Sequence, residues 1–304
     1  MACVMVLSSF AFCWSIFISA CTFLTGGKLV VLGRWDAEEA MRHIQQFGVT
    51  EFRSVPTMYI QLLNHPAAAE YDLSSLRVCI CGSAPMPLEV ARQWKERYGI
   101  DIWEGYGLSE ATTVNCGNIA GHSPRYGSIG KCYQKCNTIK IFDGDDRELP
   151  PNRTGEIVIR GSGVMLGYWN RPEETAEALL NGWLHTGDIG HMDEDGYLYI
   201  TERKKDLIIR GGENVYPKEV ENVLHMHPMV LEAGVIGVPD PVYGEEVRAF
   251  VVLKVSGSAD EKEIIDFCSQ HLPAYKRPKS VFFMEALPRS AVGKVLRREL
   301  RSIG

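Results

Sequence analysis

Polar and apolar positions in residues 28–48 follow the pattern of a strand that leads into a helix. A short apolar run at residues 28–32 predicts a β-strand, and Met41, Ile44 and Phe47 then recur at helical spacing. Asp36 is a suitable N-cap for this helix, with a glutamate three residues later and a glycine directly after Phe47. The segment therefore predicts one β–α unit.

The same order recurs in the next part of the chain. Residues 77–81 form a short apolar run, Pro87 suits the first turn of a helix that carries Val90 and Trp94, and residues 101–103 predict another strand. Strands that alternate with helices are typical of a parallel sheet covered by helices. We therefore expect an α/β fold whose first part is a parallel α/β subdomain.

The pattern changes twice further along. Residues 126–201 contain short alternating runs separated by Gly, Asp and Asn, which predict an antiparallel β subdomain. A charged stretch at residues 202–206 has no apolar anchor and marks a boundary. We expect residues 1–202 to belong to a large domain and residues 203–304 to form a small, mobile α+β C-terminal domain.

Within the small domain, apolar spacing again predicts both helices and strands. A helix is expected from Pro217, strands at residues 233–238 and 247–253, and a further helix at residues 261–272. This mixture is what the α+β interpretation rests on.

The opening of the chain is uncharged from residue 2 to residue 27. Such a run is long enough to cross a bilayer, but it contains several serines and threonines and lacks basic residues before Lys28 to orient it. We favour a buried helix of a large core, with a membrane-spanning segment as the alternative. Contact with a membrane surface is compatible with this run but is not required.

Composition narrows the class of protein. The 304 residues are 45% hydrophobic and 23% charged, as in globular proteins. The formal net charge is −6 and no long basic stripe is present, so we do not expect a nucleic-acid partner. Nine cysteines at irregular spacing favour reduced thiols over disulfides or zinc, which suggests a cytoplasmic protein.

Five separated segments carry candidate chemistry. They are residues 82–85 (GSAP), 106–110 (YGLSE), 183–188 (WLHTGD), 203–212 (RKKDLIIRGG) and 288–294 (PRSAVGK). In this order they resemble the adenylate-forming (AMP-binding) superfamily, which includes acyl-CoA synthetases, luciferases and the adenylation domains of peptide synthetases. The sequence of residues 205–221 (KDLIIRGGENVYPKEVE) most resembles that of fatty-acyl-CoA ligases.

The first two segments have the composition of a nucleotide site. An aromatic wall with close backbone approach suits an adenine ring, and Tyr106 lies beside small residues that permit it. These small residues and their neighbour are Gly82, Ser83, Ala84, Pro85 and Gly107. Glu110 offers a hard oxygen ligand for Mg²⁺, and Ser109 a hydroxyl for a phosphate. Taken singly, these segments are also an ordinary turn and an ordinary helix start.

The resemblance implies roles for these residues and for two more. It implies adenine stacking for Tyr106, phosphate contact for Ser109 and the metal and catalytic role for Glu110. Asp188 follows a turn and would accept hydrogen bonds from both ribose hydroxyls, with Arg203 as a second ribose or phosphate contact. On its own sequence, Asp188 could equally belong to an Asx-turn.

The remaining implied roles lie in the small domain. The resemblance makes Lys294 the catalytic lysine, whose ammonium separates a carboxylate from the α-phosphate during adenylation. It makes Lys205 the hinge about which the small domain swings between adenylation and thioester formation. Gly211 and Gly212 would then let the pantetheine arm of CoA pass close to the backbone.

The expected activity is that of an ATP-dependent fatty acid–CoA ligase that uses ATP, Mg²⁺ and CoA. The family carries a phosphate loop upstream of these motifs, and the chain contains none. We therefore expect a C-terminal portion of such an enzyme that adenylates poorly by itself and exposes apolar surface. The alternatives are an aryl-CoA ligase and a nucleotide-binding or interaction fragment without turnover.

Overall fold

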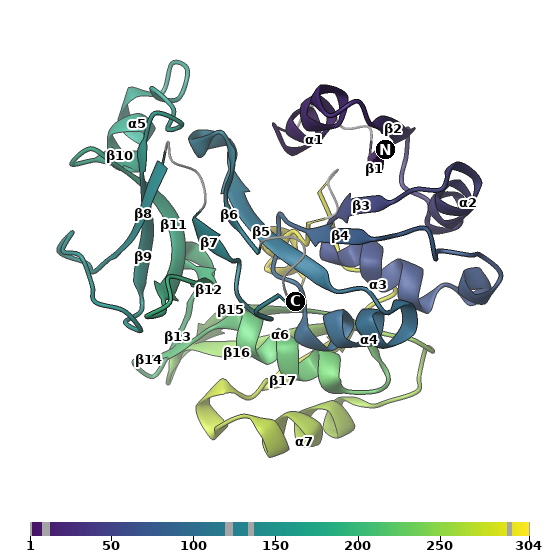
Figure 1. Cartoon of the computed structure of the whole chain (residues 1–304). Helices are drawn as coiled ribbons and strands as arrows, with labels where there is room; N and C mark the ends of the chain where they lie inside the picture. The colour runs from purple at the N-terminus through teal and green to yellow at the C-terminus, as the bar shows by residue number, and fades with distance from the viewer. Residues whose placement is uncertain (1, 8–12, 119–123, 133–136, 291–293, 304) are drawn as a thin grey trace. The chain divides into compact units, whose positions relative to one another are not determined.

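The chain folds into two compact units. The structure, a computed structural model, describes residues 2–7, 13–118, 124–132, 137–290 and 294–303, and its course is drawn in Figure 1. The two units are Met1–Ile200 and Thr201–Gly304, here called unit 1 and unit 2.

A seven-stranded sheet organises the first part of unit 1. Its order is β2-β1-β3-β4-β5-β6-β7, in which the first five strands run parallel and the last two antiparallel. The strands are β1 (Cys3–Leu7), β2 (Lys28–Leu32), β3 (Glu51–Ser54), β4 (Val78–Cys81), β5 (Ile102–Leu108), β6 (Thr113–Gly117) and β7 (Lys131–Cys132). The parallel strands alternate with helices, as the hydrophobic pattern predicts.

In the part of the chain that the structure describes, four α-helices connect the parallel strands. They are α1 (Cys13–Leu24), α2 (Ala37–Phe47), α3 (Pro56–Asn64) and α4 (Leu88–Tyr98). Asp36 caps α2 by accepting a hydrogen bond from the Glu39 amide, and Gly48 ends it in the left-handed conformation, so this predicted helix is confirmed. Figure 1 shows α3 lying next to α4 beside the sheet. Neither β3 nor α3 was expected from the sequence.

The uncharged opening differs from the expectation of one buried helix. Of the residues described there, Cys3–Leu7 form a strand inside the sheet and Cys13–Leu24 form a helix. Val4 and Val6 pack against Ile18 of α1, whereas Met5 points to the other face of the sheet. Among the residues that the structure describes, no helix is long and apolar enough to span a membrane. A strand in the centre of a parallel sheet is apolar on both of its faces. Its sequence therefore resembles that of a buried helix, which is why the strand was not expected.

A second, antiparallel sheet completes unit 1. Its order is β10-β11-β9-β8, and β12 pairs with β11. The elements are β8 (Asn137–Phe142), β9 (Gly155–Gly161), α5 (Pro172–Ala178), β10 (Leu179–Leu180), β11 (Trp183–Met192) and β12 (Leu198–Arg203), whose last three residues belong to unit 2. Its core includes Ile139, Ile157 and Leu184, which come from three neighbouring strands.

Unit 2 is a mixed sheet covered by helices. The strand order is β14-β13-β16-β15, and β17 pairs with β16 in parallel. The elements are β13 (Ile208–Arg210), β14 (Glu213–Val215), α6 (Pro217–Met226), β15 (Val230–Asp240), β16 (Gly244–Leu253), α7 (Glu261–His271), β17 (Ser280–Phe283) and α8 (Arg297–Leu300). Val220 and Leu224 of α6 are buried against this sheet.

The expected fold class is confirmed as a mixed α/β architecture with a parallel sheet, antiparallel sheets and an α+β C-terminal part. One detail of the α2 pattern was wrong. Met41 and Ile44 are fully buried, but Phe47 is about half exposed at the last position of the helix. Apolar spacing alone does not tell whether the end of a helix extends past the sheet that it covers.

Candidate functional site

The segment 82–85 begins where β4 ends, at the carboxyl edge of the parallel strands. The Gly82 amide donates to the Ser54 carbonyl at the end of β3. Ser83 adopts a φ of 70°, a left-handed conformation that is uncommon for a residue with a side chain. Ligands in open parallel sheets bind outside the carboxyl ends of the strands, so the loop lies where a binding site is expected.

A buried carboxylate fixes the far end of this loop. Glu104 of β5 is 7% exposed, and its Oε2 accepts a hydrogen bond from the Met86 amide at 3.0 Å. The loop between Gly82 and Met86 is thus held at both ends while Ser83 and Pro85 stay exposed. Glu104 could not be predicted from the sequence, because a single carboxylate within an apolar strand gives no spacing signal.

Tyr106 and Asp188 meet although they are far apart in the sequence. The Tyr106 hydroxyl donates to Asp188 Oδ2 at 2.6 Å, and the two residues are only 8% and 3% exposed. Burial raises the pKa of Tyr106 well above its ordinary value, and the nearby Asp188 charge raises it further, so the phenol remains the donor. The predicted aromatic wall and the predicted ribose carboxylate therefore form one hydrogen-bonded pair.

An irregularity in β11 presents Asp188. The register between β11 and β9 shifts between His185 and Ile189. Thr186 Oγ1 donates to the Ile157 carbonyl at 2.7 Å and accepts from the Asp188 amide at 3.1 Å. The Asp188 side chain is thus positioned by a β-bulge that Thr186 ties to the neighbouring strand.

A carboxylate beside the bulge strengthens it. Glu156 Oε1 accepts a hydrogen bond from the Gly187 amide at 3.0 Å, and Glu156 Oε2 lies 3.3 Å from Nδ1 of His185. His185 is therefore a structural partner of Glu156.

Ser109 and Glu110 lie on a single 3₁₀ turn that follows β5. Glu110 Oε1 accepts a hydrogen bond from the Tyr168 hydroxyl at 3.0 Å, and the Glu110 carbonyl accepts from the Met165 amide. The Ser109 hydroxyl lies 3.3 Å from the Cys13 thiol. Tyr168 is a further residue that the sequence analysis did not find.

The donors at this turn suit a magnesium ion that is shared with a nucleotide. Magnesium in nucleotide sites binds one or two carboxylates together with phosphate oxygens and water. Glu110 is half-buried and oriented by Tyr168, so its carboxylate could serve as the single protein ligand of this kind. Among the described residues, no group of three acidic, His or Cys side chains forms a separate metal site.

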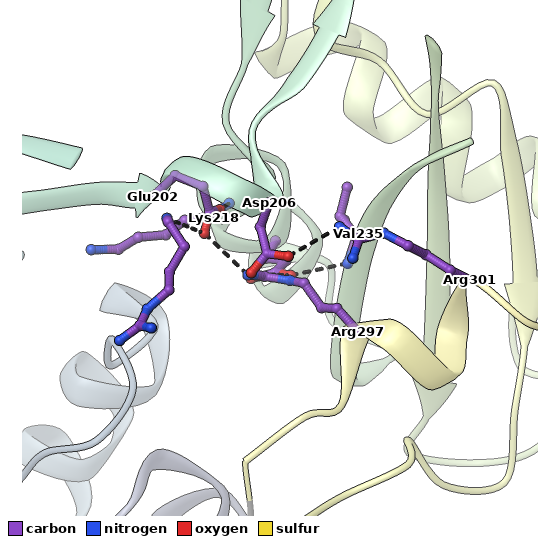
Figure 2. A network of polar contacts seen from close by, with 8 residues as sticks. Glu202, Asp206, Lys218, Val235, Arg297 and Arg301 are labelled. Carbon is purple, nitrogen blue, oxygen red and sulfur yellow. Dashed lines mark hydrogen bonds and ion pairs between the residues drawn. The ribbon is translucent and has the colours of Figure 1, made fainter. Parts of the chain in front are cut away.

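In unit 2, acidic residues on both sides of Lys205 form ion pairs. Lys205 lies on a 3₁₀ turn, Lys204–Asp206, and is exposed. On either side of it, Glu202 and Asp206 are buried, with 5% and 9% of their surface exposed. Both accept hydrogen bonds from Arg297, and Figure 2 shows their side chains pointing toward it. Arg203 is exposed, and its amide donates to Glu202 Oε1.

Gly211 and Gly212 form the two-residue turn between β13 and β14. Their φ values are 59° and 86°, and Arg210 pairs with Glu213 across the turn. A hairpin of this length favours glycine where both central residues have positive φ. The turn by itself therefore explains both glycines, and the Gly211 amide is also bonded to the Tyr243 carbonyl. The structure thus places this pair in a tight turn.

Lys294 stands on a narrow hairpin before α8. Arg289 and Val295 form a β-bridge, and the Ser290 amide donates to the Lys294 carbonyl at 2.9 Å. The Lys294 side chain is exposed. Residues 291–293, which complete the predicted motif, lie outside the described residues.

The predicted residues thus fall into two groups. In unit 1 the structure pairs Tyr106 with Asp188, and it places the 82–85 loop and the Ser109–Glu110 turn at the ends of β4 and β5. Unit 2 carries Arg203, Lys205, Gly211, Gly212 and Lys294.

Comparison with known proteins identifies the family. Residues 2–169 match the AMP-binding enzyme family, and residues 219–294 match the AMP-binding enzyme C-terminal domain. The chain belongs to the AMP-binding enzyme family. The resemblance based on the five motifs is thereby confirmed.

The curated relatives include CoA ligases for both aliphatic and aromatic acids. The long-chain-fatty-acid–CoA ligase of Bacillus subtilis is 46% identical over 90% of this chain and 49% of its own length. A feruloyl-CoA synthase from Amycolatopsis is 41% identical over 92% of this chain and 57% of its own length. The chain spans about half the length of the curated relatives it matches.

A solved structure has the same fold. ATP-bound MatB from Rhodopseudomonas palustris is 32% identical with a TM-score of 0.90, over 99% of this chain and 60% of that protein.

Proposed function

We propose that this chain carries the nucleotide-handling residues and the mobile lid of an ATP-dependent fatty acid–CoA ligase. A carboxylate would attack the α-phosphate of ATP to give an acyl-adenylate and pyrophosphate. The CoA thiol would then attack the acyl carbon, form the thioester and release AMP and a proton. The observation that carries the proposal is the buried Tyr106–Asp188 hydrogen bond in a chain 46% identical to a fatty acid–CoA ligase.

The Tyr106–Asp188 pair would bind the adenosine part of the nucleotide. Asp188 would accept hydrogen bonds from the ribose hydroxyls, and its carboxylate is held for that purpose by Tyr106 and by the β11 bulge. The Tyr106 ring would stack on adenine beside the loop formed by Gly82, Ser83, Ala84 and Pro85, and Gly107 would let the backbone approach the base. A buried and oriented carboxylate loses little conformational entropy on binding, which favours affinity.

The phosphate side would be handled by Ser109 and Glu110. The Ser109 hydroxyl is exposed and could donate to a phosphate oxygen, while Glu110 would hold Mg²⁺, whose charge would neutralise the phosphates. Tyr168 keeps the Glu110 carboxylate in one orientation through its 3.0 Å hydrogen bond. Arg203 would supply a further contact to ribose or phosphate.

Residues 203–304 would act as a lid that serves the two steps in turn. Lys294 would reduce the repulsion between the substrate carboxylate and the α-phosphate in the first step. A turn of the lid about Lys205 would then replace the lysine hairpin by the Gly211–Gly212 turn, alongside which the CoA arm would pass. We place the division from the large domain at residues 202–203.

An aromatic acid is the second candidate substrate. Feruloyl-CoA synthase is 41% identical and a 2-succinylbenzoate–CoA ligase from Bacillus mycoides is 42% identical, close to the values for fatty acid ligases. The nucleotide and lid residues would act in the same way with either acid.

The first half-reaction is tested by acid-dependent exchange of pyrophosphate into ATP, with acids from butyrate to palmitate and with ferulate. Lys294→Ala should lower exchange by roughly 10²- to 10³-fold because one preorganised cation is lost. Lys262→Ala removes an exposed lysine elsewhere in unit 2 and serves as the matched control. Equal losses in both variants would contradict the role of Lys294.

The second half-reaction is tested separately with a synthetic acyl-adenylate and CoA. Thioester formation from this intermediate should persist in Lys294→Ala. Binding of AMP without either half-reaction would support a nucleotide-binding module, and the absence of AMP binding would overturn the proposal.

A further inference from the structure

Arg297 contacts acidic residues on both sides of Lys205. Its Nη1 donates to Glu202 Oε1 at 3.1 Å and to Asp206 Oδ2 at 3.4 Å. Figure 2 shows the three side chains together. Glu202 precedes Lys205 by three residues and Asp206 follows it directly. We call these two contacts of Arg297 the hinge bridge.

The hinge bridge is anchored away from Lys205 as well. Arg297 Nη2 donates to both carboxylate oxygens of Glu221 in α6, at 2.9 and 3.1 Å. Glu202 Oε2 accepts from the Lys218 amide at the start of α6, and Arg301 donates to Asp206 Oδ1. The guanidinium is therefore held on α6 independently of its contacts to the two flanks of Lys205.

Because these contacts are largely buried, losing one of them costs more free energy than losing a surface ion pair. Burial alone would lower the pKa of Arg297, but the charges of Glu221, Glu202 and Asp206 raise it, so the guanidinium stays charged. Removing one partner of a buried ion pair leaves an uncompensated charge, which is costly. A hydrogen bond that involves a charged group is also stronger than one between neutral groups.

A rotation of the backbone at Lys205 moves Glu202 and Asp206 relative to each other. One guanidinium nitrogen can reach both carboxylates in only a narrow range of such rotations, because a hydrogen bond weakens steeply beyond its ordinary distance and angle. Arg297 can therefore keep both contacts, to Glu202 and to Asp206, at only one backbone conformation of Lys205, which we call the hinge setting.

We propose that Arg297 is a positioning residue that sets the hinge, since the lid can turn about Lys205 only when the Arg297–Glu202 contact opens. The inference rests on the proposed two-step function, in which the lid serves each step in a different position. Arg297 also begins α8, and the Leu296 amide donates to the Pro288 carbonyl. The hinge setting is thereby linked to the hairpin that bears Lys294.

Glu202→Gln and Glu221→Gln form a matched pair for the test. Each of the two glutamates binds Arg297 and accepts a hydrogen bond from a backbone amide. Each substitution replaces the charged carboxylate by a neutral amide of similar shape. Only Glu202 lies across Lys205 from Asp206. A hinge effect should therefore follow from the first substitution and not from the second.

Hydrogen exchange of the Leu207 amide is the direct readout, because this amide donates to the Arg203 carbonyl across Lys205. In Glu202→Gln, its exchange should accelerate about tenfold, as expected for a weakened charge-assisted contact. In Glu221→Gln, the Leu207 amide should keep its rate, while the Val235 amide, which donates to Glu221, exchanges faster. An unchanged Leu207 rate in Glu202→Gln, or an equal increase in both variants, overturns the proposal.

The two half-reactions supply the functional readout in the full chain. Glu202→Gln should change the ratio of thioester formation from acyl-adenylate to adenylation by several-fold, because one step uses the bridged hinge and the other the open hinge. Glu221→Gln should leave the ratio unchanged. A uniform loss of both steps in Glu202→Gln would mean a merely structural role and overturn the positioning role. If the unmodified chain performs neither step, the proposed function fails, and the exchange of Leu207 still decides whether Arg297 holds the hinge.

Discussion

At the scale of single residues, the Tyr106 hydroxyl has more than one consequence. It donates a hydrogen bond to Asp188, which is buried. This bond offsets part of the free-energy cost of removing the carboxylate from water. The aromatic ring was the part of Tyr106 that the sequence could suggest. Its hydroxyl gained a role only because β5 and β11 bring the two side chains together.

Tyr106→Phe should therefore weaken nucleotide binding while it keeps the ring. We expect the dissociation constant of AMP, measured by calorimetry, to rise roughly 5- to 30-fold, equivalent to about 1–2 kcal/mol for the lost hydrogen bond to a charged group. Tyr98→Phe is the control, because the Tyr98 hydroxyl is buried with no hydrogen-bond partner in the part of the chain that the structure describes. A similar loss in both variants would disprove a specific role of the Tyr106–Asp188 bond.

His225 makes the stability of unit 2 depend on pH. Burial lowers its pKa from 6.5 to about 4, and this outweighs the opposing effect of Glu221. Since the unfolded chain binds the proton more readily, the contribution of His225 to stability is complete above pH 6.5 and is lost as the pH falls through 4. We expect a loss of roughly 1–3 kcal/mol over this range.

An NMR titration of the His225 ring and unfolding of the chain at several pH values would check this. In His225→Gln, the free energy of unfolding should depend less on pH between 6.5 and 4. A His225 ring that titrates near its ordinary pKa would contradict the prediction.

At the scale of elements, the two sheets of unit 1 meet at Gly130. The Ile129 amide donates to the Leu198 carbonyl, and the Leu198 amide donates to the Gly130 carbonyl, both at 2.9 Å. Gly130 has a φ of 86°, and a β-carbon there would overlap the main chain of Gly117 and Asn118. Only glycine fits this junction, because the obstructing atoms are backbone and have no rotamer to change.

Gly130→Ala should destabilise unit 1 by more than about 3 kcal/mol, since both the left-handed backbone and the overlap have to be relieved. Gly182→Ala is the control, because Gly182 has a similar φ of 78° with open space at the β-carbon. We expect a cost of about 1–2 kcal/mol for it. Tryptophan fluorescence reports on unit 1 alone, because all six tryptophans precede residue 201. Equal costs would contradict the steric argument.

The elements themselves were partly predictable. The helix of Asp36 and Gly48 carries local signals at both ends, and its bounds follow from them. The opening run carries none, and its division into β1 and α1 depends on β2 and β3, which pair with β1 along its two edges. Apolar residues alone do not distinguish a central strand from a buried helix.

At the scale of the whole molecule, the proposed function depends on freedom at Lys205. Lys205→Pro would fix φ at this position near −65° and restrict the preceding residue as well. We expect adenylation to persist and thioester formation from acyl-adenylate to fall by at least about tenfold, because in the proposed function the turned lid would complete the second site.

Lys205→Ala removes the charge but keeps the backbone freedom, and it should retain the balance between the two steps. Rapid-quench assays of each half-reaction would measure both variants. If Lys205→Pro lost both steps to the same degree, the chain would not work by turning about this residue.

The family could be predicted from the order of five short motifs, because each keeps a residue type whose chemistry is local: a glycine turn, a serine beside a glutamate, a lysine after a glycine. The partners of those residues could not be predicted. Glu104, Thr186 and Tyr168 support the site through hydrogen bonds, and none of them has a spacing that marks it.

The sequence by itself determined the alternation of strands and helices, the helix caps and the residue types at the candidate site. These depend on interactions between residues a few positions apart, which the order of the chain encodes directly. Only the tertiary structure decided that Tyr106 binds Asp188, 82 residues away, and that Arg297 binds Glu202, 95 residues away. Such contacts depend on which strands and helices become neighbours, and that is set by packing of the whole unit.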